Sequence, residues 1–168
     1  MKKPLLYLLI LVVAVLGSSC SQSSEGTFEV GKNTFLLNGK PFVVKAAEIH
    51  YPRIPKEYWE HRIKMCKALG MNTICLYVFW NFHEPEEGRY NFEWLDRAVS
   101  LAEKYGLKVI MCTPTSTPPV WLSKKHPDIL IRRDNGVQIQ HGRRQHASWS
   151  SDCYRRYVEN IVSRLAKH

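Results

Sequence analysis

Three short apolar runs alternate with two stretches of helical periodicity along the middle of the chain. The first run covers residues 42–49, and over 56–69 apolar side chains then recur every three or four positions, as on one side of a helix. The second run, 72–80, is apolar at nearly every position, and a second helical pattern over 92–105 leads to the third run, 107–112. Because strands that alternate with helices form parallel sheets, this order predicts a parallel α/β architecture.

Turn and capping residues predict what lies before and after this core. Asn38-Gly39 lies between two short apolar segments, and this dipeptide is typical of tight hairpin turns because both residues adopt positive φ. The segment 113–149, rich in Pro and Arg, is predicted to be a loop, and Ser150 or Ser151 to begin a last helix. The expected order is therefore a hairpin, a β-α-β-α-β unit, a loop and a helix.

The first twenty residues have the features of a bacterial export signal. Two lysines precede an uncharged apolar run over 5–16, which as a helix would cover about 18 Å of the roughly 30 Å hydrocarbon core. Small residues then lead to Cys20, an order that resembles a lipoprotein signal, in which the cysteine is acylated. We expect a signal peptide over 1–20, lipidation at Cys20 and a polar tether over 21–27. Ordinary secretion and an uncleaved anchor are the alternatives.

Export with acylation would place the mature protein in a bacterial cell envelope, lipid-anchored in the periplasm or on the cell surface. Such compartments permit disulfides. The four cysteines after the tether are widely spaced within apolar patterns and lack metal-ligand spacing, so we expect buried free thiols and no metal site. They are Cys66, Cys75, Cys112 and Cys153.

Composition narrows the class of protein. The chain has 168 residues, of which 45% are hydrophobic and 23% charged, as in ordinary globular proteins. Its formal net charge is +9, but basic residues alternate with acidic ones and no nucleic-acid-reading motif accompanies them, so we expect no nucleic-acid partner. No glycine-rich phosphate loop follows any of the three strands, which argues against a nucleotide cofactor.

Polar and aromatic side chains follow each predicted strand instead. They form the segments Glu48-Ile49-His50-Tyr51, Trp80-Asn81-Phe82-His83-Glu84 and Thr113-Pro114-Thr115. Functional residues at the carboxyl ends of successive strands are typical of a (β/α)₈ barrel. Aromatic rings suit the C–H faces of a sugar, while polar side chains bind its hydroxyls. The sequence therefore predicts a partial TIM barrel, made of the first three βα units after a hairpin, and a carbohydrate ligand.

Ordered motifs in the first half of the chain resemble a known enzyme family. Phe35-Leu36-Leu37-Asn38-Gly39-Lys40-Pro41-Phe42, then the segment 48–55, then Tyr77-Val78-Phe79-Trp80-Asn81-Phe82-His83-Glu84-Pro85 resemble the start of glycoside hydrolase family 35 β-galactosidases. The resemblance covers about 28–92. After the third strand, the Gly-Pro-Tyr motif of that family is absent.

The second half is similar to a related family. From about Glu93 to His168, motifs such as Thr113-Pro114-Thr115-Ser116-Thr117-Pro118-Pro119-Val120-Trp121-Leu122 and Gly142-Arg143-Arg144-Gln145 are similar to family 42 β-galactosidases. Both families are retaining enzymes on the same barrel. The resemblance therefore implies cleavage of terminal β-galactosides in oligosaccharides or glycans, without a metal or an organic cofactor.

The resemblance also implies roles for single residues in substrate binding. Tyr77 would offer a hydroxyl to the sugar, Asn81 would line the pocket, and Arg143 or Arg144 would contact the galactosyl unit. Trp121 would stack on sugar. Each has a structural alternative: a core tyrosine, a loop-ordering amide, a solvated arginine and a tryptophan that wedges a loop.

Two glutamates at strand ends are expected to be structural. Glu84 matches a structural glutamate of the family, and we expect Glu48 to pair with Arg53, while His50 is interpreted as a hydrogen-bonded structural histidine. Retaining hydrolysis needs two carboxyl groups about 5–5.5 Å apart, which the family supplies after its fourth and seventh strands.

Only three barrel strands are predicted here, and no Asn-Glu pair ends any of them. We therefore expect residues 28–168 to be the truncated N-terminal portion of the enzyme, with no catalytic residue in this chain and no activity alone. A β-glucosidase or β-xylosidase of the same barrel group is one alternative. A non-catalytic, glycan-binding surface lipoprotein is another.

Overall fold

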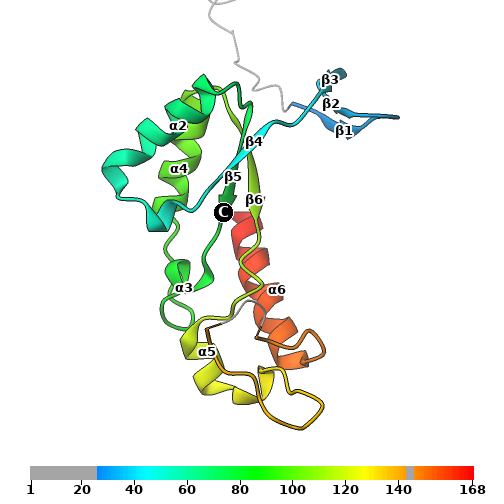
Figure 1. Cartoon of the computed structure of the whole chain (residues 1–168), viewed down its shortest axis with the longest axis vertical. Helices are drawn as coiled ribbons and strands as arrows, with labels where there is room; N and C mark the ends of the chain where they lie inside the picture. The colour runs from blue at the N-terminus through cyan, green and yellow to red at the C-terminus, as the bar shows by residue number, and fades with distance from the viewer. Residues whose placement is uncertain (1–25, 143–145) are drawn as a thin grey trace, which may run out of the picture. The chain divides into compact units, whose positions relative to one another are not determined.

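The computed structural model describes residues 26–142 and 146–168, in two units that divide between Val43 and Val44 (Figure 1). The predicted signal peptide, with Cys20, and most of the predicted tether lie outside the described residues. Arg143 and Arg144 also lie outside them.

The first unit contains an antiparallel sheet of three short strands: β1 (Phe28–Val30), β2 (Phe35–Leu37) and β3 (Lys40–Phe42). Asn38 and Gly39 have φ angles of 53° and 73°, so the predicted tight turn between β2 and β3 is confirmed. Strand β1, which the pattern did not predict, pairs with β2, and the Phe28 ring stacks on Phe35 at a centroid distance of 5.1 Å.

The second unit is built on a parallel sheet in the order β4 (Ala46–Ile49), β5 (Thr73–Tyr77) and β6 (Lys108–Cys112). Helices α2 (Trp59–Ala68) and α4 (Glu93–Lys104) connect the strands. The predicted parallel α/β architecture is therefore confirmed, as an open sheet and not a closed barrel. The apolar run 42–49 is divided between β3 and β4, which belong to different sheets.

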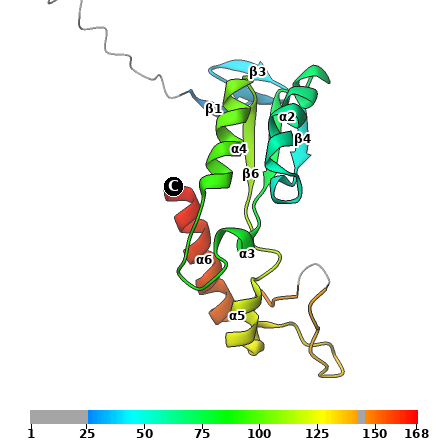
Figure 2. The ribbon, with the colours of Figure 1, turned by 90° about the vertical axis from the view of Figure 1, so that its left-hand side faces the viewer.

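Both connecting helices pack on the same side of this sheet (Figures 1 and 2). Ile74 and Leu76 of β5 are fully buried there, in one cluster with Ile63 of α2 and Leu95 of α4. The predicted buried stripe of the first helix ends earlier than expected, because Leu69 is 76% exposed just after α2. Burial on this side is thus what holds the helices to the strands.

A second core lies around the last helix, α6 (Asp152–Lys167). The Ser151 Oγ accepts a hydrogen bond from the Tyr154 backbone N–H at 3.2 Å, which confirms the predicted helix start. This core also buries side chains from short helices that the pattern missed: α3 (Trp80–His83), α5 (Val120–Lys125) and the 3-10 turn η3 (Pro127–Ile129). Two more 3-10 turns, η1 (Tyr51–Arg53) and η2 (Lys56–Tyr58), precede α2.

Within the described ranges, the helices are too short or too polar to cross a membrane.

Candidate functional site

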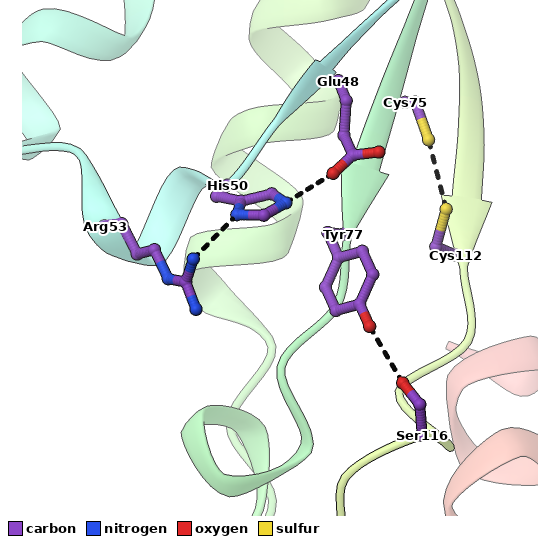
Figure 3. Close-up of polar contacts among 7 residues, drawn as sticks. All are labelled: Glu48, His50, Arg53, Cys75, Tyr77, Cys112 and Ser116. Atoms are coloured by element: carbon purple, nitrogen blue, oxygen red, sulfur yellow. Dashed lines mark hydrogen bonds and ion pairs between the residues drawn. The ribbon is translucent and has the colours of Figure 1, made fainter. Parts of the chain in front are cut away.

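The side of the β4–β5–β6 sheet that faces away from α2 and α4 carries the polar side chains. Side chains alternate between the two sides of a strand, so Glu48 of β4, Cys75 and Tyr77 of β5, and Cys112 of β6 lie on one side (Figure 3). Glu48 is the register partner of Cys75, and Tyr77 is that of Cys112. We call this side the open face, because Glu48 and Ile110 are exposed on it.

Tyr77 is at the carboxyl end of β5, with its side chain half-buried on the open face. Its hydroxyl lies 2.9 Å from the Ser116 Oγ, which comes from the segment after β6. Its ring is 5.2 Å from the His50 ring, centroid to centroid. Tyr77 is thus held on the open face by contacts from two loops, whereas its contact with a sugar stays a prediction.

Glu48, His50 and Arg53 form a chain of hydrogen bonds beside Tyr77 (Figure 3). The Arg53 guanidinium donates to His50 Nδ1 at 3.2 Å, and His50 Nε2–H donates to the Glu48 carboxylate at 2.5 Å. These partners fit the neutral imidazole with its proton on Nε2. The expected pairing of Glu48 with Arg53 was wrong, because His50 lies between them and bonds both. Glu48 keeps more than half of its side chain exposed.

Glu84, after β5, is in the interior and 2% exposed. One carboxylate oxygen accepts from the Trp80 Nε1–H at 2.6 Å and the other from the Gly88 backbone N–H at 2.9 Å. Burial, followed by the hydrogen bond to Glu84, raises the pKa of Tyr90 to about 12. With both oxygens bound inside the protein, Glu84 has the geometry of a structural carboxylate, as expected.

A second polar network lies in the interior next to Glu84. Tyr51 hydrogen-bonds His83 Nε2, and His83 Nδ1–H donates to the Asn91 carbonyl at 2.7 Å. Burial lowers the pKa of His83, because the charged imidazole loses its hydration there. Burial also raises the pKa of Tyr51. This network therefore positions the loop after β5 and is stable with a neutral histidine.

The structure does not gather all of the predicted sugar-binding residues. Asn81 has an exposed side chain on α3. Trp121 donates its indole N–H to the Glu84 backbone carbonyl at 2.9 Å, and its ring centroid lies 5.6 Å from that of Tyr157. These contacts favour the alternative in which this tryptophan wedges a loop. Its sugar contact stays a prediction, as do the roles of the two arginines outside the described ranges.

One feature of the open face escaped the sequence pattern. The Sγ atoms of Cys75 and Cys112 lie 3.1 Å apart, although 37 positions separate them in the chain. The sequence predicted a parallel sheet, but only the strand order and register place these thiols together. The four cysteines in the described part are half-buried and free, not fully buried as expected. No three potential metal ligands gather within residues 26–142 and 146–168.

Comparison with known proteins shows which enzyme family this chain resembles. The model of glycoside hydrolase family 42, β-galactosidase, matches residues 50–168. β-Galactosidase BbgII of Bifidobacterium bifidum is 37% identical over 115 residues, which are 68% of this chain and 17% of that protein.

Solved structures agree with the family match. A β-galactosidase from Halorubrum lacusprofundi superposes with a TM-score of 0.68 at 34% identity, over 74% of this chain and 18% of that one. A family 42 β-galactosidase from G. stearothermophilus gives a TM-score of 0.70 at 31% identity, over 76% and 19% of the two chains. Strands β4, β5 and β6 and the helices that connect them therefore correspond to part of a TIM-barrel enzyme.

The chain spans about a fifth or less of the length of these relatives. The family 42 match begins at His50 and not near Glu93, so it includes most of the segment that resembled family 35. The comparison does not support the family 35 assignment. The chain belongs to glycoside hydrolase family 42, the β-galactosidases.

Proposed function

We propose that this chain supplies the N-terminal βα units of a retaining β-galactosidase and that its open face forms part of the galactoside-binding site. The observation that carries the proposal is the position of Tyr77, Glu48 and His50 at the carboxyl ends of β5 and β4, in and directly before the family 42 match over 50–168. In barrels of this kind, substrates bind at that end of the strands.

The chemistry of the three side chains supports a sugar ligand. The exposed Glu48 carboxylate accepts hydrogen bonds from sugar hydroxyls, and its bond to His50 fixes its direction. The Tyr77 hydroxyl both donates and accepts. Rings of His50, Tyr77 and Phe79 lie 5.2–5.5 Å apart and offer an apolar surface for C–H groups.

The proposal assigns binding, and not bond cleavage, to these residues. Retaining hydrolysis requires a nucleophile and an acid/base about 5–5.5 Å apart. Glu84 has both oxygens engaged by Trp80 and Gly88, so it is not free to attack a glycosidic carbon. We therefore propose that the reacting carboxylates belong to parts of the enzyme beyond these three strands.

Sugar binding by the purified full chain tests the proposal. In saturation-transfer NMR, methyl β-galactoside should give signals that weaken in Tyr77→Phe and persist in Tyr58→Phe, a matched change at an exposed tyrosine of η2. Equal signals in both variants and the wild type would overturn the role of Tyr77. Methyl β-glucoside, run in parallel, separates the galactoside from the glucoside alternative.

A colorimetric assay tests whether this chain binds galactosides without cleaving them. The chain should not release nitrophenol from nitrophenyl β-galactoside. Turnover that disappears in Glu84→Gln would contradict the structural role of Glu84.

We also propose that Cys20 carries a lipid anchor that holds the protein in the cell envelope. The support is the order of basic, apolar and small residues before this cysteine. Metabolic labelling with a fatty acid in a bacterial host should mark the wild type and Cys66→Ser but not Cys20→Ser. Labelling of Cys20→Ser at the wild-type level would refute the anchor.

A further inference from the structure

The thiols of Cys75 and Cys112 contact each other across two neighbouring parallel strands. Their Sγ atoms are 3.1 Å apart, so that one thiol donates a hydrogen bond to the other (Figure 3). A disulfide needs a sulfur–sulfur distance of about 2 Å, so the two atoms need to approach by only about 1 Å to bond. Neither thiol is engaged in a disulfide in this structure.

The position of the pair makes it reachable from solvent. Both side chains are half-buried on the open face, and Cys112 is the last residue of β6. The other two described thiols are half-buried as well: Cys66 of α2 packs against the core between α2 and α4, and Cys153 packs against the core around α6. Because closure of a disulfide requires a second sulfur close by, the 3.1 Å separation makes Cys75 and Cys112 the pair placed to react.

Burial weakens Cys75 as a nucleophile. Burial, the neighbouring Cys112 thiol and the Glu48 carboxylate raise the pKa of Cys75 to about 11. The thiolate is the attacking species in exchange, and Cys75 forms little thiolate at neutral pH. Attack by Cys112 on an external disulfide is then the first step, and Cys75 completes the reaction.

We propose that Cys75 and Cys112 are a redox-active dithiol, a modification site that closes to an intramolecular disulfide between β5 and β6. With a small disulfide such as glutathione disulfide, the Cys112 sulfur first forms a mixed disulfide and expels one glutathione thiolate. The Cys75 sulfur then attacks the Cys112 sulfur and expels the second glutathione. Two electrons pass from the protein to glutathione disulfide, and the two thiol protons leave with the two glutathiones.

The consequence of closure falls on the open face. Cys112 is in register with Tyr77, and Ser116, the partner of Tyr77, follows four residues later. A bond between Cys75 and Cys112 joins β5 to β6 beside that contact. We therefore expect oxidation to raise the thermal midpoint of the chain, because the cross-link restricts the unfolded state.

Peptide mapping of the full chain in glutathione buffers tests the proposal. After incubation with excess glutathione disulfide at pH 8, mass spectrometry should find one peptide pair joined through Cys75 and Cys112, about 2 Da lighter than the sum of the two reduced peptides. Reduction with dithiothreitol should reverse it. Raising the pH to 9 should accelerate closure, because more of Cys75 is then deprotonated.

Matched variants separate this pair from the other thiols. Cys66→Ser and Cys153→Ser should still form the linked peptide, whereas Cys75→Ser should stop at a stable glutathione adduct on Cys112. Unmodified thiols under full oxidation, an adduct on Cys112 that persists in the wild type, or a link between other cysteines would each overturn the proposal. The result is independent of galactoside binding, so failure here leaves the proposed function intact.

Discussion

The two sides of the β4–β5–β6 sheet differ in the segments that contact their side chains. On the helix-covered side, Ile74 and Leu76 meet apolar side chains from α2 and α4, the two helices that directly connect these strands. On the open face, Glu48 and Tyr77 find partners in the loops after the strands, His50 and Ser116. The packed side is therefore covered by the helices that connect neighbouring strands. The polar groups of the open face are bonded instead by the loops that follow the strands.

The two sides also differ in function: the covered side stabilises the fold, and the open face carries the reactive groups. Burial on the covered side supplies the free energy that holds the unit together. The open face carries hydroxyl, carboxylate and thiol groups within reach of one another, at the cost of exposed apolar atoms such as those of Ile110, which is 42% exposed. Substitutions on the two sides should thus have very different effects.

The largest difference should come from removing a side chain on each side. Leu76→Ala leaves a cavity under the helices and should lower the free energy of unfolding by about 2–5 kcal/mol. Ile110→Ala on the open face should cost less than about 1 kcal/mol. Urea unfolding followed by circular dichroism measures both. Equal losses would show that the open face is buried in solution, for example by self-association.

A second test extends the comparison to the loop after β5. Glu84→Ala leaves the Trp80 and Gly88 N–H groups without their charged acceptor and should cost about 2–3 kcal/mol. Glu86→Ala, at a surface pair with Arg89, should leave stability nearly unchanged. The same unfolding experiment applies. A harmless Glu84→Ala would mean that the interior position of this carboxylate does not depend on its two bonds.

The interior network should make stability depend on pH. The folded protein holds the pKa of His83 below its unfolded value of 6.5, so the unfolded state binds a proton first as the pH falls. Stability should be steady above about pH 6.5 and decline below it, until the folded His83 also titrates.

The matched pair for this test is His83→Gln and His61→Gln. Thermal midpoints between pH 7.5 and 5 should fall less steeply in His83→Gln than in the wild type, and His61→Gln, at an exposed position of α2, should follow the wild type. Some slope should remain, since burial also lowers the pKa of His146. Parallel slopes for the wild type and His83→Gln would contradict the role of His83.

The smallest effect is expected at Tyr77 on the open face. Tyr77→Phe and Ser116→Ala each remove one half-buried hydrogen bond, and each should cost about 1 kcal/mol or less. The double variant should cost less than the sum of the two, which is the signature of a direct contact. Strict additivity in urea unfolding would show that the contact contributes nothing to stability.

The order and type of the main elements follow from residue spacing. The alternating runs predicted the parallel strands, Asn38-Gly39 predicted the hairpin turn, and Ser151 predicted the start of α6. The spacing of residues within each element indicates these features, although the pairing of the strands joins distant residues. The strand division at Val43 and the exposure of Leu69 were missed, because both depend on which distant segment packs against them.

In the candidate site, too, some features were predictable from the sequence and others were not. The sequence placed Glu48 at the end of a predicted strand, and the family resemblance singled out Tyr77. The hydrogen-bonded chain through His50 and the inward position of Trp121 required the path of the loops, which local patterns do not encode.

By itself, the sequence determined the parallel α/β class, the hairpin turn and the strand ends at which polar groups gather, since residue spacing and turn chemistry act over a few residues. Only the tertiary structure decided that the Cys75 and Cys112 thiols touch and that Glu84 is sealed by Trp80 and Gly88. The register between strands and the packing of loops set those distances, and both result from the folded chain as a whole.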